Sequence, residues 1–384
     1  MSEDRFTETI RESWFSRIGG AFKGIVVGVI LSVVAFVLLF TNEGRAVKRY
    51  KTLKEGGGAV VSVAADRVAP EHTGKLIHVT GKADTDAVLT DSVFGVSTNA
   101  LMLNRIVEMY QWKESTQSET RKKLGGGSET VKTYSYSKGW SKRLIDSADF
   151  KKPTGHENPG AMPYRSTEQM ADRVGLEVFA LPPSLVGSID NFTPLVLGGE
   201  TPMPEALVGK GTWHEGGVYI GNDPVSPRIG DLRVKFEVAL PTEVSVIAKQ
   251  VGESFAPYEA SAGGTIELLQ MGIHPAVAMI EKAQAGNKAL SWMLRFLGFI
   301  LMLVGLGLIL RPLSVMADVL PMLGSVVGAG TGIIALLSAA VLTLITVAVA
   351  WMVYRPLLGM LLVAVATGLT VAIRSKLKAA KAAA

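Results

Sequence analysis

The sequence predicts an α+β integral membrane protein: four transmembrane helices, one N-terminal and three C-terminal, hold a large β-rich extracytoplasmic domain. Two observations favour this class. Apolar runs of membrane-spanning length occur only towards the two ends of the chain, and residues 41–290 between them alternate apolar and polar side chains. With mean hydropathy +0.30 and only 19% charged residues, the composition excludes a disordered chain.

The first predicted transmembrane helix covers residues 21–40. The stretch from Gly24 to Phe40 has no charged residue and would extend about 25 Å as a helix. Lys23 can snorkel, which brings the residues before it into the span. The residues after Phe40 offer no small-residue cleavage site, so we interpret the run as a retained helix and not as a signal peptide.

Residues 1–20 are predicted to be a cytoplasmic segment with a short amphipathic helix. Phe6, Ile10, Trp14 and Ile18 recur every four residues among polar side chains, as on one face of a helix. This stripe either packs on protein or lies in the lipid interface. An aromatic ring beside cations suits anionic lipid, so the candidate interface residues are Trp14, Arg11, Arg17 and Lys23.

The middle of the chain, residues 41–290, is predicted to be β-rich and to contain two barrel-like halves. Alternating apolar and polar residues predict strands at 75–81, 105–112, 132–137, 232–238 and 243–249. The run Gly125–Gly127 between two of them indicates a hairpin loop. Helical spacing is confined chiefly to residues 167–179 and 274–285.

Three further spans are predicted after the β-rich region, at 291–310, 330–353 and 356–373. Residues 311–329 contain Asp318 and Pro321, which favours an interfacial or re-entrant segment, with a fifth crossing as the alternative. Residues 374–384 form a basic tail. Basic residues outside the first and last spans favour cytoplasmic termini, whereas the cluster from Arg45 to Lys54 argues for the opposite orientation.

Several segments resemble the LUMA family, also called transmembrane protein forty-three. They span nearly the whole chain: Phe40–Ala46, Val68–Glu71, Gly74–Gly81, Val107–Trp112, Tyr134–Tyr136 with Trp140, Gly230–Val234 and Tyr354–Pro356. The resemblance implies cytoplasmic termini, a large domain across the membrane, and an oligomeric organiser of membrane protein complexes. It also implies the endoplasmic reticulum or inner nuclear membrane in a eukaryote. The absence of cysteine favours a bacterial member, in the cytoplasmic (inner) membrane.

The sequence contains none of the usual catalytic or cofactor-binding motifs. The chain has no cysteine, which excludes thiol catalysis and cysteine zinc sites. His156–Glu157 and His214–Glu215 lack the second histidine that a helical zinc site needs, so we expect ordinary hydrogen-bonded roles and no cofactor or metal. The carboxylates of Glu71, Glu108 and Asp231 could converge in space as in an enzyme, but nothing in the sequence favours this over structural pairing with arginine. Since the basic surplus flanks membrane spans, we expect lipid and not nucleic acid as its partner.

Small and hydroxyl residues in the predicted spans suggest two further roles. Glycines spaced by four favour close helix approach, and the association candidates are Gly24, Gly28, Gly324, Gly328 and Gly332. The alternative for the last three is a flexible turn. Hydroxyls within the third span could line a pore formed by several subunits, and the pore candidates are Ser338, Thr343 and Thr346.

These observations favour a non-enzymatic, homo-oligomeric membrane scaffold that organises other membrane proteins or lipids. The alternatives are an oligomeric ion channel or pore and, less favoured, a lipid-modifying enzyme. Four aromatic residues are candidates for the surface or core of the β-rich domain, and the core is favoured because aromatic strand residues usually pack across strands: Trp112, Tyr134, Tyr136 and Trp140.

Overall fold

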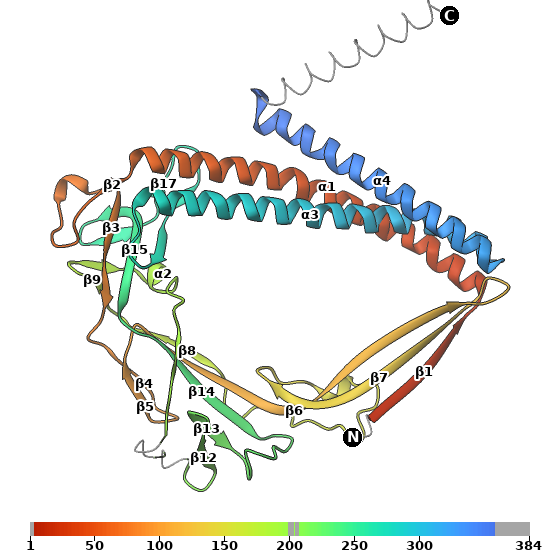
Figure 1. Cartoon of the computed structure of the whole chain (residues 1–384), viewed down its shortest axis with the longest axis horizontal. Coiled ribbons are helices and arrows are strands. Elements are labelled where there is room, and N and C mark those ends of the chain that lie inside the picture. The colour runs from red at the N-terminus through yellow and green to blue at the C-terminus, as the bar shows by residue number, and fades with distance from the viewer. Residues whose placement is uncertain (1–3, 199–202, 204–206, 358–384) are drawn as a thin grey trace, which may run out of the picture.

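The computed structural model describes residues 4–198, 203 and 207–357. Three long helices lie along one side, and a β domain meets them at both ends (Figure 1). The helices are α1 (Trp14–Ala59), α3 (Ala276–Ala317) and α4 (Pro321–Tyr354). In the described part of the chain, these three are long and apolar enough to cross a membrane. The predicted fourth span and the basic tail fall outside the described residues, except residues 356 and 357.

Two of the helices extend well beyond the predicted spans. The first span was expected to end at residue 40, but α1 continues to Ala59, and α3 begins at Ala276, fifteen residues before the predicted residue 291. The extra turns of both helices form a polar two-helix stalk. The basic cluster from Arg45 to Lys54 lies on this stalk, so it belongs to a continuous helix and not to a loop at a membrane surface.

The segment 311–329 does not form a separate element. Helix α3 continues through Pro312 to Ala317, a turn contains Asp318, and α4 begins at Pro321. Helix α3 therefore has no break after residue 310, where the predicted second span ends. Proline removes one backbone hydrogen bond, but a helix tolerates this loss where neighbouring elements enclose it, and Pro312 is buried.

The larger sheet is antiparallel and runs in the order β1-β7-β6-β14-β13-β12. Its strands are β1 (Asp4–Glu12), β7 (Ser128–Ser141), β6 (Met102–Lys122), β14 (Leu232–Ala239), β13 (Gly217–Ile220) and β12 (Gly211–His214). Two short strands pair from the side, β8 (Thr167–Met170) with β6 and β11 (Thr193–Leu195) with β14. The strands predicted at 105–112, 132–137 and 232–238 are confirmed, as is the triple-glycine hairpin loop.

Five strands of the second sheet close into a small barrel. The ring pairs β3 (Leu76–Asp84), β9 (Val174–Leu176), β10 (Phe179–Leu181), β16 (Ser254–Ala256) and β15 (Thr242–Val251), which returns to β3. Outside the ring, β2 (Val61–Ser62) and β19 (Leu268–Met271) extend the sheet. The strands predicted at 75–81 and 243–249 are confirmed. Among the described residues there is one barrel beside an open sheet, instead of two barrel-like halves.

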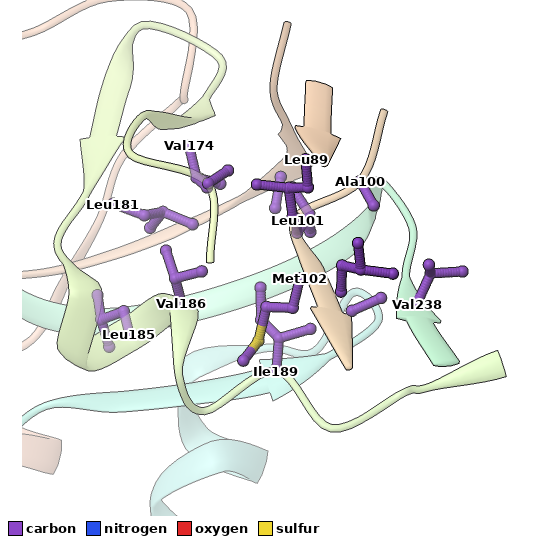
Figure 2. Packing of buried hydrophobic residues seen from close by; sticks show 14 of the residues in the cluster. Leu89, Ala100, Leu101, Met102, Val174, Leu181, Leu185, Val186, Ile189 and Val238 are labelled. Atoms are coloured by element: carbon purple, nitrogen blue, oxygen red, sulfur yellow. The ribbon is translucent and has the colours of Figure 1, made fainter. Parts of the chain in front are cut away.

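Smaller elements complete the domain. β4 (Val88–Asp91) pairs with β5 (Val96–Asn99), β17 (Tyr258–Glu259) pairs with β18 (Thr265–Ile266), and α2 (Pro183–Val186) is a single helical turn. The main hydrophobic core fills the barrel and the adjoining face of the larger sheet (Figure 2). A second core joins the barrel to the ends of α1 and α3 through Leu53, Ile266 and Met279.

Two predicted helices are strands in the structure. Residues 4–12 form β1, which pairs with β7 over nine residues, because a spacing of four is even and also places Phe6 and Ile10 on one face of a strand. Residues 167–179 contain β8, β9 and the start of β10. There the helical spacing is overridden by barrel closure, and Glu177 adopts a left-handed φ of 53° in the turn between β9 and β10.

Candidate functional site at the two ends of the helix bundle

Helices α1 and α3 approach each other most closely at two glycines. A Cβ atom on Gly28 would lie 2.5 Å from the carbonyl oxygen of Gly305, and a Cβ on Gly305 would lie 2.5 Å from Ser32 Oγ. Further along, Leu39 packs over Gly298, where a Cβ would lie 2.6 Å from the leucine side chain. Only glycine permits this contact, so the small residues close the seam within one chain.

The predicted association glycines therefore have several environments. A Cβ on Gly24 would make ordinary contact, 3.9 Å from Leu308. Gly324 and Gly328 lie within α4, not in a flexible turn, and face Asp318 and Ser314 of the α3 end. Gly332 differs, since a Cβ there would meet nothing within 4 Å. This last position leaves an open, smooth site on α4.

The predicted pore hydroxyls lie on α4, which packs against α1 and α3. Thr346 is 3% exposed, and its hydroxyl donates to the carbonyl oxygen of Leu342 at 2.8 Å. The hydroxyl of Thr343 is buried and has no hydrogen-bond partner among the described residues. Ser338 is half-buried. Thr346 thus contributes to helix packing in the single chain, and a pore role for the three residues stays a prediction.

A buried ion pair holds the three helices together at the stalk end. The side chain of Glu43 is fully buried and accepts from Arg295 Nε at 2.6 Å and Nη2 at 2.9 Å. Trp351 of α4 donates its indole N–H to the same carboxylate at 2.8 Å. The Arg295 guanidinium also lies 4.8 Å from the centre of the Trp292 ring. We call this group the stalk-end cluster: Glu43, Trp292, Arg295 and Trp351.

Polar contacts between α1 and α3 continue along the stalk next to this cluster. Asn42 is buried and donates to the backbone and the hydroxyl of Ser291. Arg45 donates to Asn287 Oδ1 at 3.0 Å, and Asn287 in turn donates to the carbonyl oxygen of Ala46. The two helices therefore change from a glycine seam to a hydrogen-bonded seam as they leave the apolar run.

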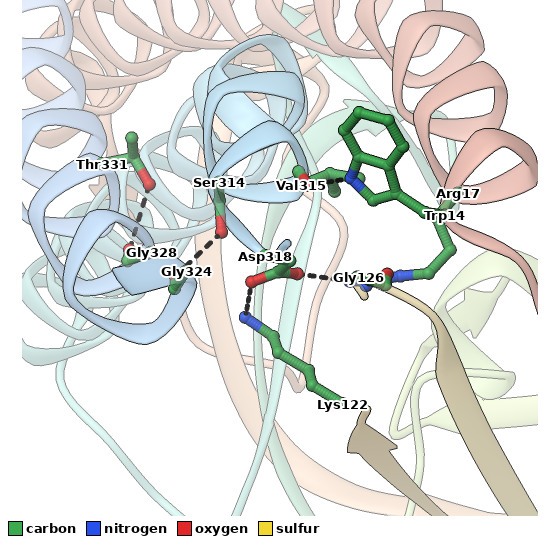
Figure 3. Close-up of polar contacts among 10 residues, drawn as sticks. All are labelled: Trp14, Arg17, Lys122, Gly126, Ser314, Val315, Asp318, Gly324, Gly328 and Thr331. Atoms are coloured by element: carbon green, nitrogen blue, oxygen red, sulfur yellow. Dashed lines mark hydrogen bonds and ion pairs between the residues drawn. The ribbon is translucent and has the colours of Figure 1, made fainter. Parts of the chain in front are cut away.

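At the opposite end, the turn between α3 and α4 binds the tip of the β6–β7 hairpin (Figure 3). Asp318 is fully buried and pairs with Arg17 of α1 at 2.6 Å and with Lys122 of β6 at 2.7 Å. Arg17 also donates to the carbonyl oxygen of Gly126 in the hairpin loop. One carboxylate thus ties together the start of α1, the end of α3 and the hairpin.

Trp14 completes this contact by donating its indole N–H to the carbonyl oxygen of Val315 at 2.9 Å. The backbone N–H of Gly125 reaches the carbonyl oxygen of Val319 at 3.2 Å. The first of these bonds adds to a carbonyl in the last turn of α3, where carbonyl oxygens have no i+4 partner within the helix. We call this group the tip latch: Trp14, Arg17, Lys122, Gly126 and Asp318.

Of the four predicted lipid-interface residues, three contact other parts of the protein and one is exposed. Trp14 and Arg17 belong to the tip latch, and Arg11 pairs with Glu129 of β7 at 3.0 Å. Lys23 is exposed on α1.

The sequence did not predict the tip latch, although one signal was present: Asp318 is an isolated acidic residue between two apolar runs. The stalk-end cluster had the same kind of signal, since Glu43 and Arg295 each border an apolar run.

The separation of the two polar groups matches a lipid bilayer. Between Trp14 and Glu43, α1 rises about 44 Å, and between Arg295 and Asp318, α3 rises about 35 Å. A hydrocarbon core measures about 30 Å, and 40–45 Å with its headgroups. The helix surfaces in between are largely exposed and apolar, as lipid contact requires.

The predicted aromatic residues of the domain lie mainly in packed positions. Tyr134 and Tyr136 are buried, and Trp112 and Trp140 are half-buried. The hydroxyl of Tyr136 donates to Glu114 Oε2 at 2.7 Å. Burial, together with this carboxylate, raises the pKa of Tyr136 to about 12.

Of the two candidate histidines, His156 takes a hydrogen-bonded role, whereas His214 Nε2 lies 3.8 Å from Glu215 Oε1, beyond hydrogen-bond distance. His156 is 1% exposed, stacks on Tyr136, and contacts the carboxylate of Asp4 at 2.8 Å and the carbonyl oxygen of Lys152 at 2.9 Å. In the described ranges no group of three or more histidine or acidic side chains could hold a metal.

Two of the candidate carboxylates have structural partners. Glu108 pairs with Arg233 at 2.6 Å, while Asp231 accepts from the hydroxyl of Tyr219 at 2.5 Å. The expected arginine pairing therefore holds for Glu108, whereas Asp231 bonds a tyrosine. Such contacts orient side chains within the sheet.

Comparison with known proteins agrees with this architecture. A family profile described as Transmembrane protein 43 matches residues 109–356. The chain is 35% identical to Transmembrane protein 43 of Rattus norvegicus, over 93% of this chain and 91% of the relative. It is 34% identical to the Homo sapiens protein, over 96% and 94%, and 30% identical to a Drosophila melanogaster homolog, over 92% of each. No solved structure matches.

The matches cover almost the entire chain, including the apolar helices and both sheets. They agree with the resemblance found in the sequence motifs and with a membrane-embedded helix bundle. This chain is therefore an integral membrane protein that belongs to the Transmembrane protein 43 family.

Proposed function

We propose that this protein is a multi-pass membrane scaffold that self-associates and organises protein complexes or lipids at the bilayer. The observation that carries the proposal is the fixed relation between the β domain and the helices. A hydrophobic joint holds one end of the bundle, through Leu53, Ile266 and Met279, and the tip latch holds the other. A domain attached at two points is held in a set position relative to the helix bundle, as an organising surface requires.

In this proposal the bilayer lies between the stalk-end cluster and the tip latch. The barrel and the stalk then stand on one side, and the turn containing Asp318 on the other. A fourth span at 356–373 would return the chain to the side of that turn, which the basic tail predicts to be the cytoplasm.

Self-association is supported by the open position at Gly332, where α4 presents a smooth surface to a neighbouring helix. The test is light scattering of the purified protein in lipid nanodiscs. We expect an oligomer, and we expect Gly332→Leu to reduce its mass. Gly20→Leu is the matched control, because Gly20 also has nothing within 4 Å but lies on α1 outside the central apolar run. A monomeric wild-type protein would contradict the proposal.

A further inference from the structure

Three strands leave the larger sheet as a long ribbon. Beyond Met109, where its pairing with β14 ends, β6 pairs with β7 over fourteen residues, and β7 pairs with β1 over nine. The ribbon comprises residues 4–12, 109–122 and 128–141. At about 3.3 Å per residue, its two longer strands extend about 43 Å, close to the thickness of a bilayer with its headgroups.

The ribbon spans the same level as the apolar helices. Its tip is fixed to the tip latch, at one end of the bundle, and its base joins the sheet that leads to the barrel and stalk at the other end (Figure 1). The pairing of β1 with β7 also means that no flat bilayer can lie between residues 4–12 and 128–141. The expected separation of residues 1–20 from the β domain by a membrane does not fit this pairing.

The surface of the ribbon is polar. It contains seven basic and six acidic residues, with many serines and threonines, and residues 115–122 of β6 are all exposed. The outer edge of β1 has no strand beside it among the described residues. Lipid hydrocarbon does not accept an open polar sheet, because it offers no hydrogen-bonding partner to the backbone and side-chain groups of the sheet. At this level the ribbon therefore needs water or protein around it.

We propose that the ribbon borders a water-filled passage at bilayer depth, enclosed by several copies of this chain with their apolar helices turned towards lipid. The inference rests on the proposed self-association, since the described residues of one copy leave the edge of β1 and residues 115–122 uncovered. The passage would be lined by side chains of the ribbon, and not by Ser338, Thr343 and Thr346 of α4. Because acidic and basic residues nearly balance along the ribbon, we expect weak selectivity between cations and anions.

The absence of native cysteine makes the first test direct. Thr7 of β1 faces Thr133 of β7, so Thr7→Cys with Thr133→Cys should form a disulfide in intact membranes under mild oxidation. The control pair is Thr7→Cys with Ser118→Cys, because Ser118 pairs with β7 and not with β1. A missing 7–133 cross-link would mean that the ribbon is not assembled in the membrane, and it would overturn the proposal.

The second test measures water at bilayer depth in sealed proteoliposomes. A membrane-impermeant thiol reagent should label Ser118→Cys rapidly and should leave Val33→Cys unlabelled, since Val33 is 56% exposed on the apolar part of α1. Labelling of Ser118→Cys with a charged reagent should also change the conductance of planar bilayers containing the protein at least twofold. An oligomer with unlabelled Ser118→Cys would refute the passage and leave the scaffold standing. A monomer in nanodiscs would refute both.

Discussion

The buried ion pair of the stalk-end cluster provides a quantitative test of how the helices are held together. Glu43→Gln removes the negative charge that accepts two hydrogen bonds from Arg295, while the new amide oxygen can still accept from Trp351. Loss of one partner of a buried pair costs about 3–5 kcal/mol. We expect the lower end of this range for Glu43→Gln and the upper end for Arg295→Met, which leaves a carboxylate buried without its cation.

The assay is the free energy of unfolding of the detergent-solubilised protein, measured for both single variants and for the double variant. Because the double variant leaves no isolated charge, it should be destabilised by at least about 2 kcal/mol less than the sum of the single variants. The control is Asp84→Asn, which breaks the exposed pair with Lys82 and should cost less than about 1 kcal/mol.

Two results would refute this reasoning. A decrease in the free energy of unfolding below about 0.5 kcal/mol for Arg295→Met would show that the carboxylate of Glu43 binds water or another partner. A buried charge left without its partner costs about 3–5 kcal/mol. Strict additivity in the double variant would show that the two side chains do not interact, despite the distance of 2.6 Å.

Three other predictions address the seam, the core and pH. Gly28→Ala should destabilise the protein by about 1–3 kcal/mol, because the new Cβ would lie 2.5 Å from a backbone oxygen of α3. The control Gly20→Ala should be neutral or stabilising, because a Cβ there meets nothing within 4 Å. Equal unfolding curves for the two variants would contradict the close approach of α1 and α3. Asp91→Asn should cost about 3 kcal/mol in the same assay, since it unpairs the buried Arg105 held at 2.7 Å, and a neutral result would argue against this ion pair. Tyr136 has its pKa raised above the ordinary value of 10, so its contribution to stability is complete below pH 10 and is lost as the pH rises towards 12. Phenolate absorbance should show a component titrating near pH 12 that Tyr136→Phe abolishes, and an unchanged titration in that variant would refute the assignment.

The sequence predicts those elements whose pattern has one structural solution. Uncharged runs of membrane-spanning length predict apolar helices, and the alternation at 105–112 fits a strand but no helix. The spacing of Phe6 and Ile10 fits both, and the choice of a strand depends on β7, more than a hundred residues away. The barrel depends on three-residue strands such as β9 and β10, which are too short to carry a periodic pattern. The tip latch combines three distant segments, and no local rule indicates that pairing.

The uninterrupted course of α1 has a mechanical consequence. One helix of 46 residues carries both the apolar run and the stalk, without a joint at the point where it leaves the hydrocarbon. The stalk from Glu43 to Ala59 is a lever of about 24 Å, so a tilt of about 10° displaces the barrel by about 4 Å. Changes in bilayer thickness alter the preferred tilt of membrane helices. In the proposed placement of the bilayer, local membrane thickness would thereby set the sideways position of the β domain.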